Sequence, residues 1–312
     1  MTTVLTEPAV GVDRARAARG RRPRPPRDWR GWQFAGPFAV VFVLVFIAPL
    51  AYALWLSLFQ TRMIGGTVFV GFDNYATALG DAQFWDGFSR VFVFLLVQVP
   101  IMLLLALVAA LAIDSARLYA SGLFRLVIFL PYAVPAVVAV LMWGFIYGDN
   151  FGLAADLNDL FGTDVIRPFA PEWILGSIGN IVTWEFVGYN MLIFYSALKT
   201  VPYELYEAAE IDGASGFQVL KAVKLPAVRG AVVIATIFSI IGSFQLFNEP
   251  NVIAPLAANV ITSDYTPNMY AYNLSFAGQQ YNYAATIAII MGLITAVIAY
   301  AVQLRGTRRE DR

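Results

Sequence analysis

The sequence predicts an all-α integral membrane protein with six transmembrane helices, and two observations predict that fold class. Hydrophobic residues make up 59% of the 312-residue chain and charged residues only 13%, with a mean hydropathy of +0.66. Soluble domains carry about 25% charged residues, so this chain lacks the charge to cover a water-exposed surface. The second observation is six apolar runs, each close to the ~20 residues that a helix needs to cross a bilayer.

Each run must be helical in lipid, because no water is present there to satisfy the backbone. In chain order, the predicted spans are residues 37–58, 91–113, 124–147, 174–198, 231–247 and 284–304. The fifth run is the shortest and the most polar. Prolines lie inside the first three runs, namely Pro49, Pro100 and the pair Pro131 and Pro135. We expect them to kink or locally unwind these helices, because proline lacks the backbone N–H.

Lysines and arginines predict the orientation, since they concentrate in cytoplasmic segments. With the N-terminus in the cytoplasm, 18 of them lie inside and only Arg62, Arg90 and Arg167 lie outside. Both termini are therefore predicted to be cytoplasmic in a multi-pass protein of the cell (plasma or inner) membrane. The outer loops are then 59–90, 148–173 and 248–283, which are long for simple connections and suggest a structured outer face.

Residues 1–31 are predicted to be a disordered basic cytoplasmic tail, and residues 32–312 the transmembrane domain. The tail contains "RGRRPRPPRDWR", whose arginines and prolines cannot build a core. It either contacts anionic lipid or only fixes the orientation. The "AYA" at residues 51–53 resembles a signal-peptide cleavage site, but the apolar run before it is longer than a typical h-region, which favours an uncleaved first span.

The composition excludes most catalytic chemistry. The chain contains no cysteine and no histidine, which removes thiol and imidazole catalysis and the usual zinc sites. Its three lysines, Lys199, Lys221 and Lys224, do not belong to a phosphate-binding loop. No span holds clustered carboxylates, so a membrane enzyme is disfavoured. We expect this chain to bind no cofactor.

One charged segment, residues 199–229, interrupts the apolar sequence on the predicted cytoplasmic side. Pro202 suits the first turn of a short helix, and "YELYEAAEI" favours that helix. Gly213 can take the positive φ that ends it. Ser215 with Gln218 predicts a capping box that opens a second helix, "FQVLKAVKL", which is expected to stop at Pro226. The segment is therefore predicted to be two short helices joined by a glycine bend.

The first of these helices has features of a docking element. Ala208 and Ala209 are small enough for another surface to approach the backbone closely. Glu204, Glu207 and Glu210 supply negative charge that suits a basic groove on a partner. These residues are equally compatible with a solvated linker between two spans.

A resemblance to a known family favours docking. "EAAEIDGASGFQVLKAVKLP" resembles the EAA motif of importer-type ABC permeases. The positions that match the motif are Glu207, Ala208, Ala209, Asp212, Gly213, Ala214, Leu225 and Pro226, while Val223 stands where isoleucine is more usual. "RLVIFLPYAVPAVVAVLMWGFIYGDNFG" and "VTWEFVGYNMLIFYSALKTVP" resemble the larger permease subunit of maltose-type sugar importers. The likeness covers roughly residues 35–305.

The resemblance implies the type I ABC importer permease fold and a mechanism that needs partners. In that family the EAA loop docks into a cytosolic ATPase, and ATP and magnesium are bound by the ATPase. The implied partners are two copies of that ATPase, a second permease subunit, which makes a heterodimer, and an extracytoplasmic sugar-binding protein. Membrane lipid surrounds the assembly, and no nucleic acid is implied. The implied function is ATP-driven import of a di- or oligosaccharide.

Polar residues within the fourth and fifth spans predict a substrate path, because polar groups in a membrane tend to face a cavity or another helix. The candidates are Glu185, Tyr189, Asn190, Ser239, Ser243, Gln245 and Asn248. They offer hydrogen bonds to sugar hydroxyls and an aromatic face for C–H groups. By the resemblance, Tyr189, Ser239 and Ser243 stand at sugar-contact positions, although Ser243 replaces an amide.

Other roles remain open for these residues. Serines in spans often bond their own backbone or a neighbouring helix. Glu185 can bind sugar, pair with the partner permease or lie near the outer rim, and Tyr132 is expected to be structural. The alternative function is a proton-coupled secondary sugar transporter with Glu185 as the proton carrier, although such transporters usually show paired repeats and several intramembrane ionisable residues.

Overall fold

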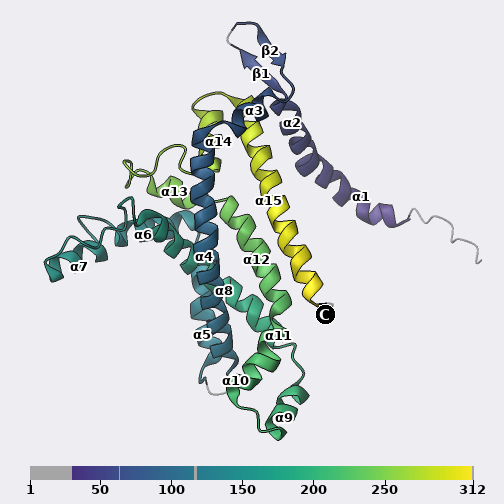
Figure 1. Cartoon of the computed structure of the whole chain (residues 1–312), viewed down its shortest axis with the longest axis vertical. Helices are drawn as coiled ribbons and strands as arrows, with labels where there is room; N and C mark the ends of the chain where they lie inside the picture. The colour runs from purple at the N-terminus through teal and green to yellow at the C-terminus, as the bar shows by residue number, and fades with distance from the viewer. Residues whose placement is uncertain (1–29, 63, 116–117, 311–312) are drawn as a thin grey trace, which may run out of the picture. The chain divides into compact units, whose positions relative to one another are not determined.

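The computed structural model describes residues 30–62, 64–115 and 118–310, with side chains from Trp32 to Gly306. The described chain is helical apart from one short hairpin (Figure 1). Five helices are long and apolar enough to cross a membrane, and a bent helix pair makes a sixth candidate. The all-α fold class predicted from the sequence is confirmed. Most of the predicted tail, residues 1–31, lies outside the described residues.

The chain divides into two compact units, Met1–Ala51 and Tyr52–Arg312. The described part of the first unit consists of α1 (Arg30–Phe42), a π-helical turn (Val43–Ile47) and the start of α2 (Ala48–Ser57). The π turn ends two residues before Pro49. A π turn can accommodate proline, which lacks the N–H that would donate the usual helical hydrogen bond. The disturbance predicted at Pro49 is therefore present.

In the second unit, four long helices form a bundle: α4 (Ala82–Asp114), α8 (Ile174–Leu198), α12 (Arg229–Phe244) and α15 (Tyr281–Glu310). α8 and α12 both pack on α4, and α12 also packs on α15 (Figure 1). The fourth predicted span has the bounds of α8. By contrast, α4 begins nine residues before the predicted span and stays α-helical through Pro100, so of the predicted kink or unwinding at Pro100 the unwinding is absent. Pro100 lies on the exposed face of the helix, where its ring has room.

The third span is broken, as Pro131 and Pro135 predict. It comprises α5 (Ser121–Phe129), a 3₁₀ turn (Leu130–Ala133) and α6 (Ala136–Ile146), and the two halves meet at 97°. α8 crosses this break closely, because a Cβ on Gly188 would lie 2.0 Å from the carbonyl oxygen of Ile128. Only glycine permits that approach.

The segments predicted to form an outer face carry secondary structure of their own. They contain the hairpin β1 (Phe59–Arg62) and β2 (Gly66–Phe69), and the helices α3 (Asp73–Leu79), α7 (Leu153–Phe161), α13 (Asn248–Ile253) and α14 (Pro267–Phe276). Asp81 joins three helices there. It accepts hydrogen bonds from the amide of Gln83 (2.9 Å), which starts α4, and from the hydroxyls of Tyr270 in α14 (2.7 Å) and Tyr283 in α15 (2.6 Å).

Candidate functional site

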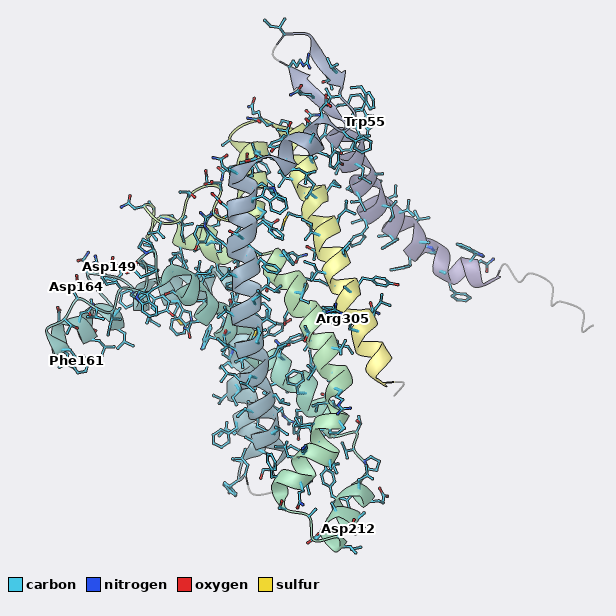
Figure 2. All side chains as sticks on the ribbon, viewed as in Figure 1. Trp55, Asp149, Phe161, Asp164, Asp212 and Arg305 are labelled. Atoms are coloured by element: carbon cyan, nitrogen blue, oxygen red, sulfur yellow. The ribbon has the colours of Figure 1, made fainter. Side chains whose placement is uncertain are left out.

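The two-helix loop, residues 199–229, forms at the end of the second unit that Asp212 marks in Figure 2. Its first helix is α9 (Tyr203–Ile211), and Pro202 directly precedes it instead of lying in its first turn. Gly213 has φ +69°, and the amide of Ala214 donates to the carbonyl of Ala209 (2.9 Å). Gly213 thus ends α9 in the left-handed conformation that the sequence predicted.

The second helix opens with the predicted capping box. The amide of Ser215 donates to Gln218 Oε1 (2.6 Å), and the amide of Gln218 donates to Ser215 Oγ (3.4 Å). The predicted stop at Pro226 is wrong, because α10 (Gly216–Val219) continues through a π turn (Leu220–Lys224) into α11 (Leu225–Ala227). The wider π turn shifts the backbone bonding by one residue and so accommodates the proline.

Most of the residues that match the EAA motif are available to a partner. Glu207, Ala208, Asp212, Gly213 and Leu225 are exposed, as is Glu204 beside them, while Ala209, Ala214 and Pro226 are half-buried. Two large apolar side chains flank the glycine bend and were missed from the sequence. Ile211 is 86% exposed and Phe217 73% exposed. Apolar side chains that protrude into water beside carboxylates are typical of a protein docking surface.

Asp114, at the end of α4, fastens this loop to the bundle. Its carboxylate accepts from Lys199 Nζ (2.8 Å), directly after α8, and from Lys224 Nζ (2.6 Å) in the π turn. Asp114 is 8% exposed, and its hydrogen bond raises the pKa of Lys199, which keeps that lysine charged at neutral pH. Lys224 also lies over the ring of Tyr206 in α9, 5.8 Å from its centre. These two ion pairs could not be predicted from the sequence, because Asp114 lies 85 and 110 residues from its partners.

A cavity of about 400 Å³ lies between α4, α8, α12 and the broken third span. It collects six of the seven predicted path residues: Tyr189, Asn190, Ser239, Ser243, Gln245 and Asn248. Tyr132, predicted to be structural, also lines it. The rings of Tyr132 and Tyr189 stack 4.9 Å apart at 18°, and they form a flat aromatic wall.

Some of the polar groups of the cavity already bond their own helices. Ser243 Oγ donates to the carbonyl of Ser239 (2.9 Å), and Asn190 Nδ2 donates to the carbonyl of Phe186 (3.0 Å). The side chains of Gln245 and Asn248 are exposed and make no hydrogen bond to a described residue. Their amides are therefore available to a hydroxylated ligand.

Two buried carboxylates lie near the cavity. Glu249, 9% exposed, is the only charged residue that lines it, and Glu185, 4% exposed, is near enough to feel the charge of Glu249 but does not line the cavity. Glu185 Oε2 is buried with no hydrogen-bond partner among the described residues. Glu249 was missed because the fifth span was expected to end at residue 247, whereas the apolar segment continues to Ile253.

Comparisons with known proteins agree with this architecture. Residues 75–309 match the family model described as "Binding-protein-dependent transport system inner membrane component". The lactose transport system permease protein LacF of Rhizobium radiobacter is 30% identical over 86% of this chain and 91% of that protein. The diacetylchitobiose uptake system permease protein NgcF of Streptomyces coelicolor is 30% identical over 87% of this chain and 80% of that protein. The trehalose transport system permease protein SugA of Mycobacterium tuberculosis is 28% identical over 86% and 85%.

A solved structure shares the fold. A chain of a bacterial ABC transporter that imports the acidic polysaccharide alginate superposes with a TM-score of 0.75, over 90% of this chain and 96% of that chain, at 18% sequence identity. The same transporter bound to its periplasmic protein gives a TM-score of 0.73, with 91% and 98% covered, also at 18% identity.

Proposed function

Because the chain belongs to the family of binding-protein-dependent transport system inner membrane components, as a permease subunit of a sugar ABC importer, we propose that it moves a di- or oligosaccharide and is driven through the loop 199–229. The chain is a transport component and not the catalytic subunit. The proposed partners are two copies of a cytosolic ATPase, which bind ATP and magnesium, a second permease and an extracytoplasmic sugar-binding protein. Both termini are proposed to be cytoplasmic.

The observation that carries the proposal is the construction of the loop. Its surface exposes Glu204, Glu207, Ile211 and Phe217, and its base is held to α4 by the buried carboxylate of Asp114. A push on the loop therefore reaches α4 and α8 directly. In this proposal the closing ATPase moves the loop, and the spans rock around the cavity that holds the sugar.

The cavity supports a neutral sugar as the substrate. It offers amides, hydroxyls and the stacked Tyr132–Tyr189 wall, and among its lining residues Glu249 is the only charged group. A cavity with a carboxylate and no lysine or arginine repels an anionic sugar. Lactose, diacetylchitobiose and trehalose, which name the transport systems of three relatives, are uncharged disaccharides.

Binding of the ATPase tests the docking role of the loop. We expect Ile211→Glu with Phe217→Glu to weaken co-purification of the ATPase by about tenfold or more, since central apolar contacts typically carry 2 kcal/mol or more. Ile64→Glu is the matched control, because Ile64 is 93% exposed and lies beside the hairpin, away from the loop. Equal ATPase binding by the loop variant and the control would count against the proposal.

Uptake into proteoliposomes that contain the full complex tests the energy source. We expect sugar uptake to need ATP, the ATPase and the binding protein. Uptake by this chain alone under a pH gradient, without ATP and abolished by Glu185→Gln, would support the proton-coupled alternative instead.

A further inference from the structure

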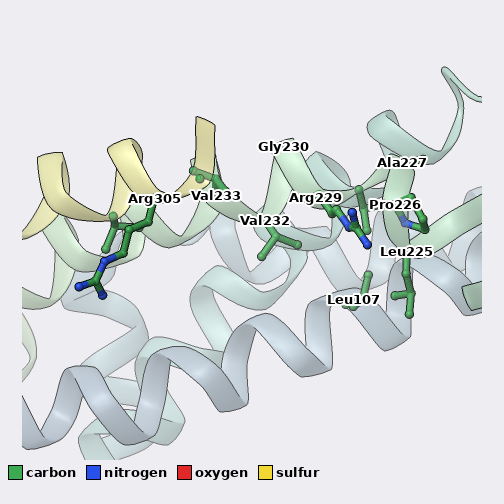
Figure 3. Close-up of a pocket in the computed structure, with 12 residues that line it drawn as sticks. Leu107, Leu225, Pro226, Ala227, Arg229, Gly230, Val232, Val233 and Arg305 are labelled. Atoms are coloured by element: carbon green, nitrogen blue, oxygen red, sulfur yellow. The ribbon is translucent and has the colours of Figure 1, made fainter. Parts of the chain in front are cut away.

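A second, larger hollow lies at the end of the bundle that carries the two-helix loop. It is a groove of about 1140 Å³ along the start of α12 and the end of α15, with Leu107 of α4 on its far side (Figure 3). The helices meet at Gly306, where an added Cβ would lie 2.7 Å from Val233. The groove is separate from the cavity proposed to hold the sugar, with which it shares no lining residue.

The lining of the groove is apolar except for two arginines. Val232, Val233 and Val302 are among its walls, and Arg229 and Arg305 are its only polar side chains. Figure 3 shows the two arginines apart along the groove, with Val232 and Val233 between them. Neither arginine forms an ion pair or hydrogen bond within the described part of the chain, and no carboxylate lines the groove.

Both arginines are placed where a membrane ends. Arg229 is the first residue of α12, whose apolar segment runs to Ile253. Arg305 lies about 36 Å along the axis of α15 from Tyr281, beyond the ~30 Å of hydrocarbon in a bilayer. Arg229 therefore marks the headgroup end of the groove, while Val233, which lies against Gly306, is at the level of Arg305.

We propose that this groove binds an anionic phospholipid, with its phosphate on Arg229 or Arg305 and its acyl chains along the valines. Arginine suits phosphate because its planar guanidinium can donate two parallel hydrogen bonds. Basic pockets between transmembrane helices are known to hold anionic headgroups. The groove exceeds the usual 300–1,000 Å³ of a small-molecule site, so a free phosphate would leave it mostly empty.

Charge also argues against one protein occupant. The N-terminal segment of this chain carries eight arginines before residue 31, so the two groove arginines repel it. An acidic, flexible lipid fits such an environment better than this basic segment does.

Native mass spectrometry of the full complex tests the proposal without any transport measurement, so it can fail independently of the proposed function. The complex is purified in mild detergent and incubated with phosphatidylglycerol or phosphatidylethanolamine. We expect the wild type to retain phosphatidylglycerol preferentially. The double variant Arg229→Gln with Arg305→Gln should retain about thirtyfold less, at ~1 kcal/mol for each arginine.

Three controls sharpen the result. Arg125→Gln is the matched control, because Arg125 lies in the middle of α5 over the ring of Tyr195 and outside the groove. It should bind lipid as the wild type does. The double variant Arg229→Lys with Arg305→Lys keeps both charges and should retain most of the binding, which separates lost charge from misfolding. Inorganic phosphate should not displace the lipid.

The proposal would be overturned by equal phosphatidylglycerol retention in the wild type and the double glutamine variant, or by release of the lipid on adding phosphate. A photo-crosslinking residue in place of Val232 identifies the occupant directly. A lipid adduct supports the proposal, whereas an adduct with a partner subunit assigns the groove to a protein interface.

Discussion

At the scale of single residues, Asp114 is the group on which the loop depends. Its largely buried carboxylate pairs with two lysines. Removal of the carboxylate charge leaves these two positively charged lysines side by side. The apolar runs located the spans, but they could not reveal this contact, because it joins residues far apart in sequence. Tyr132 and Glu249 escaped notice for a similar reason, since only the folded chain shows that both line the cavity.

We expect Asp114→Asn to destabilise the complex by roughly 1–3 kcal/mol, the range for hydrogen bonds between charged groups. The thermal midpoint should fall, and ATPase binding should weaken, since the base of the loop is no longer held. Asp86→Asn is the control, because Asp86 is exposed on the same helix and forms no ion pair with a described residue. An unchanged midpoint and unchanged ATPase binding in Asp114→Asn would show that the ion pairs of Asp114 do not stabilise the loop.

At the scale of helices, the sequence predicted the α8 bounds, the glycine bend at Gly213 and the cap at Ser215, because each depends on local chemistry. It placed the start of α4 nine residues late, since the first turns of α4 contain charged and polar residues and lie outside the hydropathy window. It also misplaced the end of the loop at Pro226, where a π turn accommodates the proline. Such turns leave no clear sequence signal.

The crossing of α8 over the broken span gives a paired prediction. Gly188→Ala places a methyl group 2.0 Å from a backbone oxygen that cannot move freely, so we expect a loss of about 3 kcal/mol or more. Gly176→Ala in the same helix meets nothing within 4 Å and should stabilise the helix by about 0.5–1 kcal/mol. Thermal unfolding of the two variants should therefore shift in opposite directions. A tolerated Gly188→Ala would disprove the close crossing.

The start of α4 gives a prediction on pH. Burial raises the pKa of Asp81, but hydrogen bonds from Tyr283, Tyr270 and the amides of Gln83 and Phe84 outweigh burial and lower it below 3.8. The ionised carboxylate therefore stabilises the fold above pH 3.8, and this contribution is lost as the pH falls through the lowered pKa. Asp81→Asn keeps a good N-cap but loses the charge.

Thermal unfolding from pH 7 down to pH 3 measures this contribution. The midpoint of the wild type should exceed that of Asp81→Asn at pH 7, and the difference should shrink as the solution becomes more acidic. A difference that grows with acidity would contradict the assigned sign.

At the scale of the whole molecule, three features of the second unit lie along α4. The Asp81 cluster lies at the start of α4, the cavity of about 400 Å³ lies beside the middle of the bundle, and the loop held by Asp114 lies at the other end of α4. The composition predicted only part of this organisation. It disfavoured a membrane enzyme and indicated membrane spans, but it carried no information on which polar residues converge.

The ion pair between Asp114 and Lys199 also shows in which direction α4 and α8 run relative to each other. Asp114 is the last residue of α4, and Lys199 directly follows α8. Because Lys199 Nζ lies 2.8 Å from Asp114 Oδ1, the two helices end side by side and run in the same direction. Among the described helices between them, α5, α6 and α7, the bent pair of α5 and α6 is the one long and apolar enough for a return through the bilayer. The bent pair is thus the sixth candidate span, despite its right-angled path.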